Sequence, residues 1–235
     1  HKGLSLAELG NFNDAISCLS QALEVSPGIA NAWLIKGFCL FAIGNYQEAV
    51  ISYDTSIGID AKNEHTWFYK GRAHLNLENY DEAIRAFDQA LFLQPEFGEA
   101  YYYKGMALAR CSRLSESAVA FEQSNRLMPD FTDAYLQKGK VLSGLGIYHE
   151  AVDAFRQVLH TLPDDLTALY GQARALDHQG LAEEAITVYT RITRIEPGCE
   201  RVYYYLGNAL ANVPRYPDAI DAYSKSLTQN PSRIE

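Results

Sequence analysis

The sequence predicts an all-α fold in which antiparallel helix pairs repeat and stack into an α-α superhelix. Three columns support this prediction, because a glycine, a small residue and a proline each recur every 34 residues along the chain. Self-similarity at one fixed period is typical of solenoids, in which each unit buries its apolar face against the next copy. We therefore expect a single array of repeats spanning residues 1–235.

Residues 64–97 show the repeating unit most clearly. From Trp67 onward, large residues spaced by three and four fall on one stripe of a first helix. Gly71 lies within this stripe, where glycine costs about 1 kcal/mol relative to alanine unless a neighbouring helix packs very close. A second amphipathic helix begins near Asp81, and Pro95 ends it. Helices shorter than about 12–15 residues are barely stable alone, so such a unit must stack on copies of itself.

Aligned on the glycine column, the chain divides into one partial repeat and six complete repeats. Their ranges are 1–29, 30–63, 64–97, 98–131, 132–165, 166–199 and 200–233. Ala173 replaces the column glycine in one repeat, Ser112 stands at a turn glycine, and Ser117 replaces a small alanine. We expect these departures to change the angle between helices locally without changing the fold.

The pattern of residues 64–97 resembles the tetratricopeptide repeat family, in which a large aromatic residue, Gly, Ala, Phe and Pro recur at fixed positions. Its matching residues are Trp67, Gly71, Ala83, Phe87, Ala90 and Pro95. The resemblance covers about seven tandem repeats, which is essentially the whole chain. It implies a right-handed solenoid whose first helices line a concave groove that binds protein partners.

By this resemblance, specificity is expected at first-helix positions that face the groove. The candidate partner-binding residues are Leu34, Phe38, Phe41, Phe68, Tyr69, Arg72, Tyr102, Tyr103, Met106, Lys140, Tyr170, Arg174, Tyr204, Tyr205 and Asn208. Each aromatic member has two interpretations, since it either packs against a second helix or contributes to an exposed patch that anchors a partner. For the group as a whole, binding is the preferred interpretation.

A further column of lysines, Lys36, Lys70, Lys104 and Lys138, precedes the glycine in consecutive repeats. Such a row of ammonium groups is suited to binding phosphates or acidic tails. Long aliphatic stems that extend past packed helices explain the column equally well. The acidic residues nearby in each unit favour this structural interpretation.

Composition argues against several classes of partner. The net charge of −9 disfavours nucleic acid, whose binding depends on Lys and Arg, and the chain contains no long apolar run of the kind that spans a membrane. The four cysteines have no C-x-x-C spacing and indicate buried thiols in a reducing compartment, so we expect a cytoplasmic location. The first and last repeats carry no polar cap, which predicts either a longer array or end-to-end self-association.

Nothing in the sequence indicates an enzyme. The six histidines share no metal-ligand spacing, no glycine-rich phosphate loop is present, and we expect neither cofactor nor metal. The chaperone-tail specificity known in the family requires Lys and Asn in a fixed register, and the matching positions of one register hold Leu34, Phe38, Tyr69, Glu99 and Tyr103.

The sequence therefore predicts a protein-interaction scaffold that binds a peptide or protein segment in its groove. The alternative is a non-catalytic arm of a larger enzyme or signalling protein, which would recruit substrate or support assembly.

Overall fold

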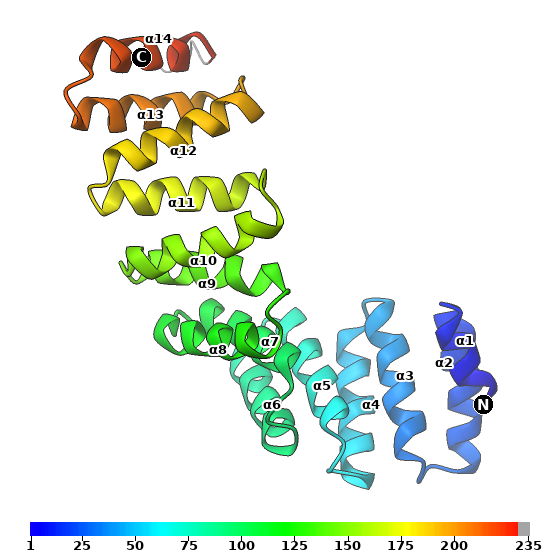
Figure 1. The fold of residues 1–235 in the computed structure, drawn as a ribbon. Helices are drawn as coiled ribbons and strands as arrows, with labels where there is room; N and C mark the ends of the chain where they lie inside the picture. The colour runs from blue at the N-terminus through cyan, green and yellow to red at the C-terminus, as the bar shows by residue number, and fades with distance from the viewer. Residues whose placement is uncertain (230–235) are drawn as a thin grey trace. The chain divides into compact units, whose positions relative to one another are not determined.

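A computed structural model describes residues 1–229. This part of the chain consists of helices joined by short turns and contains no β-strand, which confirms the all-α class (Figure 1). The described helices group into two compact units, which meet in the sequence after residue 128 and comprise residues 1–128 and 129–229.

The helices of the first unit are α1 (Lys2–Glu8), α2 (Phe12–Val25), α3 (Ala30–Ala42), α4 (Tyr46–Ile59), α5 (Glu64–Asn76), α6 (Tyr80–Leu93), α7 (Gly98–Arg110) and α8 (Leu114–Leu127). Those of the second unit are α9 (Thr132–Gly144), α10 (Tyr148–Thr161), α11 (Leu166–His178), α12 (Ala182–Ile195), α13 (Glu200–Asn212) and α14 (Tyr216–Gln229). We call the odd-numbered elements first helices and the even-numbered elements second helices.

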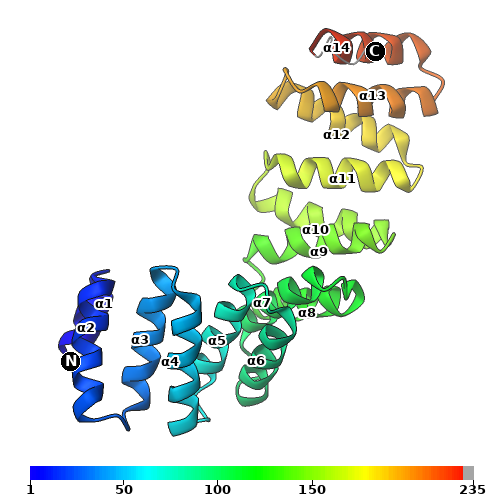
Figure 2. The ribbon, with the colours of Figure 1, turned by 180° about the vertical axis from the view of Figure 1, so that it is seen from behind.

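Each unit is built from helix hairpins that stack in order, as an all-α helical-repeat solenoid requires (Figures 1 and 2). Every first helix packs on the second helix that follows it, and every second helix packs on the next first helix of its unit. In the first unit α1, α3, α5 and α7 also touch their neighbours directly, as α9 and α11 do in the second unit. No comparable contact joins consecutive second helices within residues 1–229. The first helices therefore form the more closely packed layer.

The glycine column serves this close packing. A Cβ placed on Gly71 would lie 2.6 Å from Cε1 of Phe87, whose ring is fully buried in the second helix of the same hairpin. Gly37 meets the ring of Tyr53 in the same way. The helix-weakening glycine is therefore retained because an aromatic ring occupies the space that a side chain would need.

The turns inside the hairpins use a left-handed residue at one fixed position. Gly10, Gly44, Gly146 and Gly180 have φ between 76° and 82° there, and Glu78 and Ser112 adopt φ values of 59° and 60° at the equivalent place. A non-glycine residue in this conformation carries some strain. Pro214 cannot adopt a positive φ, and there the chain leaves α13 through an extended Val213.

The tryptophans and the lysines that recur at the repeat spacing also make contacts that hold the fold together. The indole nitrogens of Trp33 and Trp67 donate hydrogen bonds to the carbonyls of Pro27 and Ala61, at 2.9 and 3.0 Å. In the lysine column, Nζ of Lys70 lies 2.6 Å from a carboxylate oxygen of Asp54 on the preceding second helix.

Lys104 repeats this ion pair with Asp88, also at 2.6 Å. These two members of the lysine column thus bridge neighbouring repeats, in agreement with the structural interpretation. Ser117 keeps its hydroxyl satisfied by donating to the Gly105 carbonyl at 2.7 Å, which explains how a polar residue replaces a fully buried alanine.

Among the described residues, no helix is both long enough and apolar enough to cross a membrane.

Candidate functional site: the first-helix face

We define the first-helix face as the surface of each unit formed by its odd-numbered helices. In the first unit it carries nine of the residues predicted from sequence, three from each of α3, α5 and α7. All of them are partly exposed except Phe68, of which only 4% is exposed. The structure therefore places Phe68 in the core, where it packs on Phe97 and Phe87.

The centre of this face in the first unit is an arginine held among aromatic rings. The guanidinium carbon of Arg72 lies 4.8 Å from the centroid of Tyr103 and 5.0 Å from that of Phe41. Phe68 and Tyr69 complete the cluster, at 5.7 and 5.9 Å. Cations over aromatic faces at such distances are attracted by the ring quadrupoles. Arg72 thus connects α3, α5 and α7, and much of its binding capacity is already used inside the protein.

The remaining predicted residues of the first unit surround this cluster. Leu34 packs against the core formed around Tyr53, and Phe38 contacts Tyr69 edge to face at 5.7 Å. Tyr102 contacts Tyr103 in the same geometry at 5.2 Å. Met106 is partly exposed on α7. The structure thus gathers the aromatic candidates of the first unit into one continuous cluster.

A regular stacking series underlies the first-helix face. Tyr69 stacks on Tyr53 at a centroid distance of 6.3 Å and an interplanar angle of 19°. In the next repeat Tyr103 stacks on Phe87 at 6.3 Å and 21°. In each pair the first-helix tyrosine covers the large aromatic residue of the preceding second helix.

The second unit contains one pair of this series and one exception. Tyr205 stacks on Tyr189 at 6.0 Å and 17°. At the equivalent position opposite Phe155 the sequence has Gly171, so no ring covers Phe155 from this position. The α11 backbone instead approaches the ring so closely that a Cβ on Gly171 would lie 2.4 Å from Cζ of Phe155.

A hollow opens beside Gly171. It consists of two adjoining cavities of about 420 and 430 Å³ that share Lys140, Phe155, Gly171 and Arg174 in their walls. We call it the Gly171 hollow. The first cavity extends to Tyr148 and His178, and the second extends to Tyr170, Arg201 and Tyr205. Cavities of about 300–1,000 Å³ are the usual size of ligand sites.

Hydrogen bonds hold the walls of the hollow in place. The hydroxyl of Tyr170 lies 2.9 Å from Sγ of Cys199, and burial together with this bond raises the pKa of Tyr170, so the phenol stays neutral. A hydrogen bond with Tyr205 raises the pKa of Arg201. On the opposite side, Tyr148 and His178 stack at 4.8 Å and 11°. The aromatic side chains around the hollow are thus oriented before any ligand arrives.

The charge of the hollow differs from that of the whole chain. Lys140 and Arg174 are exposed, and within residues 1–229 neither forms an ion pair. Arg201 adds a third cation, whereas Glu196 is the only carboxylate among the lining residues. The hollow is therefore a positive region on a chain of net charge −9.

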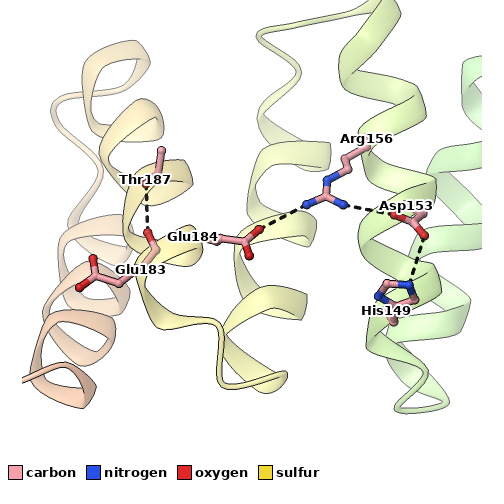
Figure 3. A network of polar contacts seen from close by, with 6 residues as sticks. All are labelled: His149, Asp153, Arg156, Glu183, Glu184 and Thr187. Carbon is pink, nitrogen blue, oxygen red and sulfur yellow. Dashed lines mark hydrogen bonds and ion pairs between the residues drawn. The ribbon is translucent and has the colours of Figure 1, made fainter.

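On the second helices of the same unit, an exposed arginine is paired with carboxylates. Figure 3 shows Arg156 on α10 positioned between two carboxylates, with Asp153 on its own helix and Glu184 on α12, both at 3.3 Å. Asp153 also lies 3.8 Å from Nε2 of His149. The charge of Arg156 is balanced by its neighbours, so this arginine provides an internal comparison for Lys140 and Arg174.

The other predicted residues of the second unit lie on α13. Tyr204 is 44% exposed and contacts Tyr205 and Tyr223. Asn208 accepts a hydrogen bond from the Tyr223 hydroxyl at 2.8 Å, so its side chain is already partly engaged. The structure therefore brings four of the predicted residues of this unit around one hollow, and it places Tyr204 and Asn208 outside the lining.

Sequence reasoning missed the decisive residue of this site, which is Gly171. Position six of the repeat holds Tyr69, Tyr103 and Tyr205, but it also holds Ile35, Gln137 and Gly171, so the glycine did not stand out in the sequence. It acquires meaning only once the stacking partner of each tyrosine is known. No group of three or more His, Cys, Asp or Glu side chains in the described residues is arranged to hold a metal ion.

The residue pattern of a known family, Tetratricopeptide repeat, matches residues 2–64, 70–124 and 136–200. These segments cover most of the sequence. The chain belongs to the tetratricopeptide repeat family. None of the curated protein sequences compared with it gives a significant match.

Solved structures of other tetratricopeptide repeat proteins share this fold. MamA is 24% identical with a TM-score of 0.66, over 68% of this chain and 94% of MamA. PilF of Pseudomonas aeruginosa is 19% identical with a TM-score of 0.68, over 89% of this chain and 93% of PilF. YrrB, described as a tetratricopeptide repeat protein with an unusual peptide-binding site, is 19% identical with a TM-score of 0.56, over 92% of this chain and 94% of YrrB. At these identities the likeness concerns the fold.

Proposed function

We propose that this tetratricopeptide repeat protein is an interaction scaffold that binds a segment of a partner protein on its first-helix face. The observation that carries the proposal is the Gly171 hollow. Lys140, Tyr170, Arg174 and Tyr205 come from three different first helices and line one hollow, although they are far apart in the sequence. Tyr and Arg are the side chains that most often anchor protein interfaces.

The rigidity of the site also supports a binding role. Wall residues that are already held by hydrogen bonds and ring stacking lose little conformational freedom when a partner docks. The partner's segment would lie across α9, α11 and α13, with the tyrosines supplying contact area and the cations fixing its orientation. The aromatic cluster around Arg72 would offer a second, more apolar contact surface on the first unit.

Site-specific photo-crosslinking tests this proposal. Thr167 is exposed and lines the hollow, so a photoreactive amino acid at position 167 will report partners that reach the first-helix face. Thr187 is an exposed threonine on the second helix α12 and serves as the matched control (Figure 3). We expect a defined protein adduct from position 167 and none from position 187.

Circular dichroism of both labelled proteins will establish that they are folded before their adducts are compared. Equal crosslinking from both positions, or crosslinking only from position 187, would contradict the proposal. Mass spectrometry of the adduct identifies the segment of the partner that lies in the hollow.

A further inference from the structure

The chemistry of the Gly171 hollow indicates what kind of segment it accepts. This inference rests on the proposed function and adds the nature of the partner. It starts from the stacking series, in which the first-helix tyrosines Tyr69, Tyr103 and Tyr205 each cover an aromatic residue of the preceding repeat. Gly171 interrupts that series opposite Phe155.

Gly171 leaves the wall of the hollow without a side chain at this point, because a Cβ there would lie 2.4 Å from the buried Phe155 ring. Gly171 lines both of its cavities over the Phe155 ring, which is only 1% exposed, so the bare backbone at Gly171 forms the floor on which an incoming group rests. Aromatic rings flank this floor on either side, with Tyr148 toward α10 and Tyr170 and Tyr205 toward α13. A flat ring fits such a position best, because aromatic side chains favour offset-stacked and edge-to-face contacts with their neighbours.

The positive charges of the hollow indicate which residues flank that ring in the partner. Lys140 and Arg174 share both cavities, and each lies at the ninth position of its repeat, on neighbouring first helices. Neither has an anionic partner in the described part of the chain, unlike Lys70 and Lys104, which pair with aspartates. Carboxylates on either side of the incoming ring would therefore gain ion pairs without displacing existing ones.

We propose that the Gly171 hollow binds an acidic segment of a partner protein through one aromatic side chain. The ring rests on the backbone at Gly171, between Tyr148 and Tyr170, and flanking carboxylates pair with Lys140 and Arg174. A protein segment fits better than a nucleic acid, because the net charge of −9 opposes the approach of an extended polyanion while the local cations accommodate a few carboxylates.

An array of short synthetic peptides is the direct test with the full chain. Each peptide carries one central Phe, Tyr or Trp flanked by Glu, and matched peptides replace either the ring by Ala or the Glu residues by Gln. We expect binding only when both the ring and the acids are present. The double variant Lys140→Gln/Arg174→Gln should weaken the affinity at least about tenfold, since it removes the charge-assisted hydrogen bonds to the peptide's carboxylates.

Arg156→Gln is the matched control, because it removes an exposed cation of the same unit whose charge is already balanced. It should leave peptide affinity unchanged. Gly171→Tyr should close the hollow with a ring from the chain itself and abolish binding. Because a Cβ at this position meets Phe155, thermal unfolding of this variant is measured alongside, and the charge variants keep the test valid if it fails to fold.

Several results would overturn the inference. These are equal binding of the peptides that lack the ring, unchanged affinity in the Lys140→Gln/Arg174→Gln variant, absence of binding to any peptide of the array, and displacement of bound peptide by a mixed-sequence oligonucleotide at physiological salt. If any of them occurs while position 167 still crosslinks a partner, the proposed function stands and only the assigned chemistry is wrong. If position 167 also fails, both proposals fall.

Discussion

Replacing Gly71 by alanine tests the origin of the glycine column. The new Cβ would lie 2.6, 2.8 and 2.9 Å from three atoms of the Phe87 ring, which is fully buried. Overpacking of this kind costs about 1–3 kcal/mol. Alanine also recovers about 1 kcal/mol of helix propensity, so the net loss of unfolding free energy should be about 0–2 kcal/mol.

Gly58 provides the matched control, because it lies in helix α4, is exposed, and has no atom within 4 Å of an added Cβ. Gly58→Ala should therefore stabilise the protein by about 0.5–1 kcal/mol. The difference between the two variants isolates the steric cost, expected at about 1–3 kcal/mol.

Urea unfolding followed by far-UV circular dichroism measures both variants. The curves are fitted with a nearest-neighbour description, because the stability of repeat proteins is approximately a sum over repeats and their interfaces. A Gly71→Ala protein as stable as Gly58→Ala would refute the steric explanation of the column.

Three further predictions concern single interactions. Arg72→Gln removes the cation from its four rings and should lower the unfolding free energy by about 1–2 kcal/mol, measured by urea unfolding; an unchanged midpoint would show that the rings hold together without the cation. Trp67→Phe loses the hydrogen bond to the Ala61 carbonyl and should cost about 0.5–1.5 kcal/mol in the same assay; no loss would mean that water replaces the bond fully. Burial, followed by the charge of Lys70, lowers the pKa of His74 below its ordinary 6.5, so the unfolded chain binds that proton more tightly. Stability should therefore fall as pH drops through 6.5, and His74→Gln should reduce that fall in thermal unfolding measured across this range; identical pH profiles would contradict this assignment.

The sequence predicted the fold through residues whose role is the same in every repeat. Gly71 and Phe87 recur as a small and a large residue because a hairpin packs a large side chain of its second helix against the backbone of its first, and this need imposes the 34-residue period. A residue type that the hairpins need at one position recurs at the repeat period, and this recurrence can be recognised in the sequence. The division into two compact units after residue 128 has no such signal, since the period continues through it unchanged.

The candidate site was predictable only in part. Phe68 and Tyr69 are adjacent on one helix, yet the first is buried and the second is partly exposed. A periodic pattern places both near the apolar stripe and does not specify which ring turns inward. For the same reason the pattern placed Arg72 among the candidate partner-binding residues and did not show that rings of its own unit surround it.

The Gly171 hollow could not be predicted from the sequence for a different reason. A glycine at a position that holds tyrosine in three other repeats is visible in the sequence, but its consequence depends on Phe155, which lies sixteen residues earlier in another helix. Whether a missing ring produces an open hollow or a collapsed contact is decided by the packing of three helices. That information resides in tertiary structure rather than in local pattern.

The affinity of the partner identified by crosslinking at position 167 tests the central claim most directly. Its dissociation constant is measured with the full chain, with Lys140→Gln/Arg174→Gln and with Arg156→Gln. We predict at least about tenfold weaker binding for the first variant and a change within about twofold for the second, because only the first removes cations that lack partners of their own. Equal affinities for all three proteins would contradict the claim that the Gly171 hollow is the binding site.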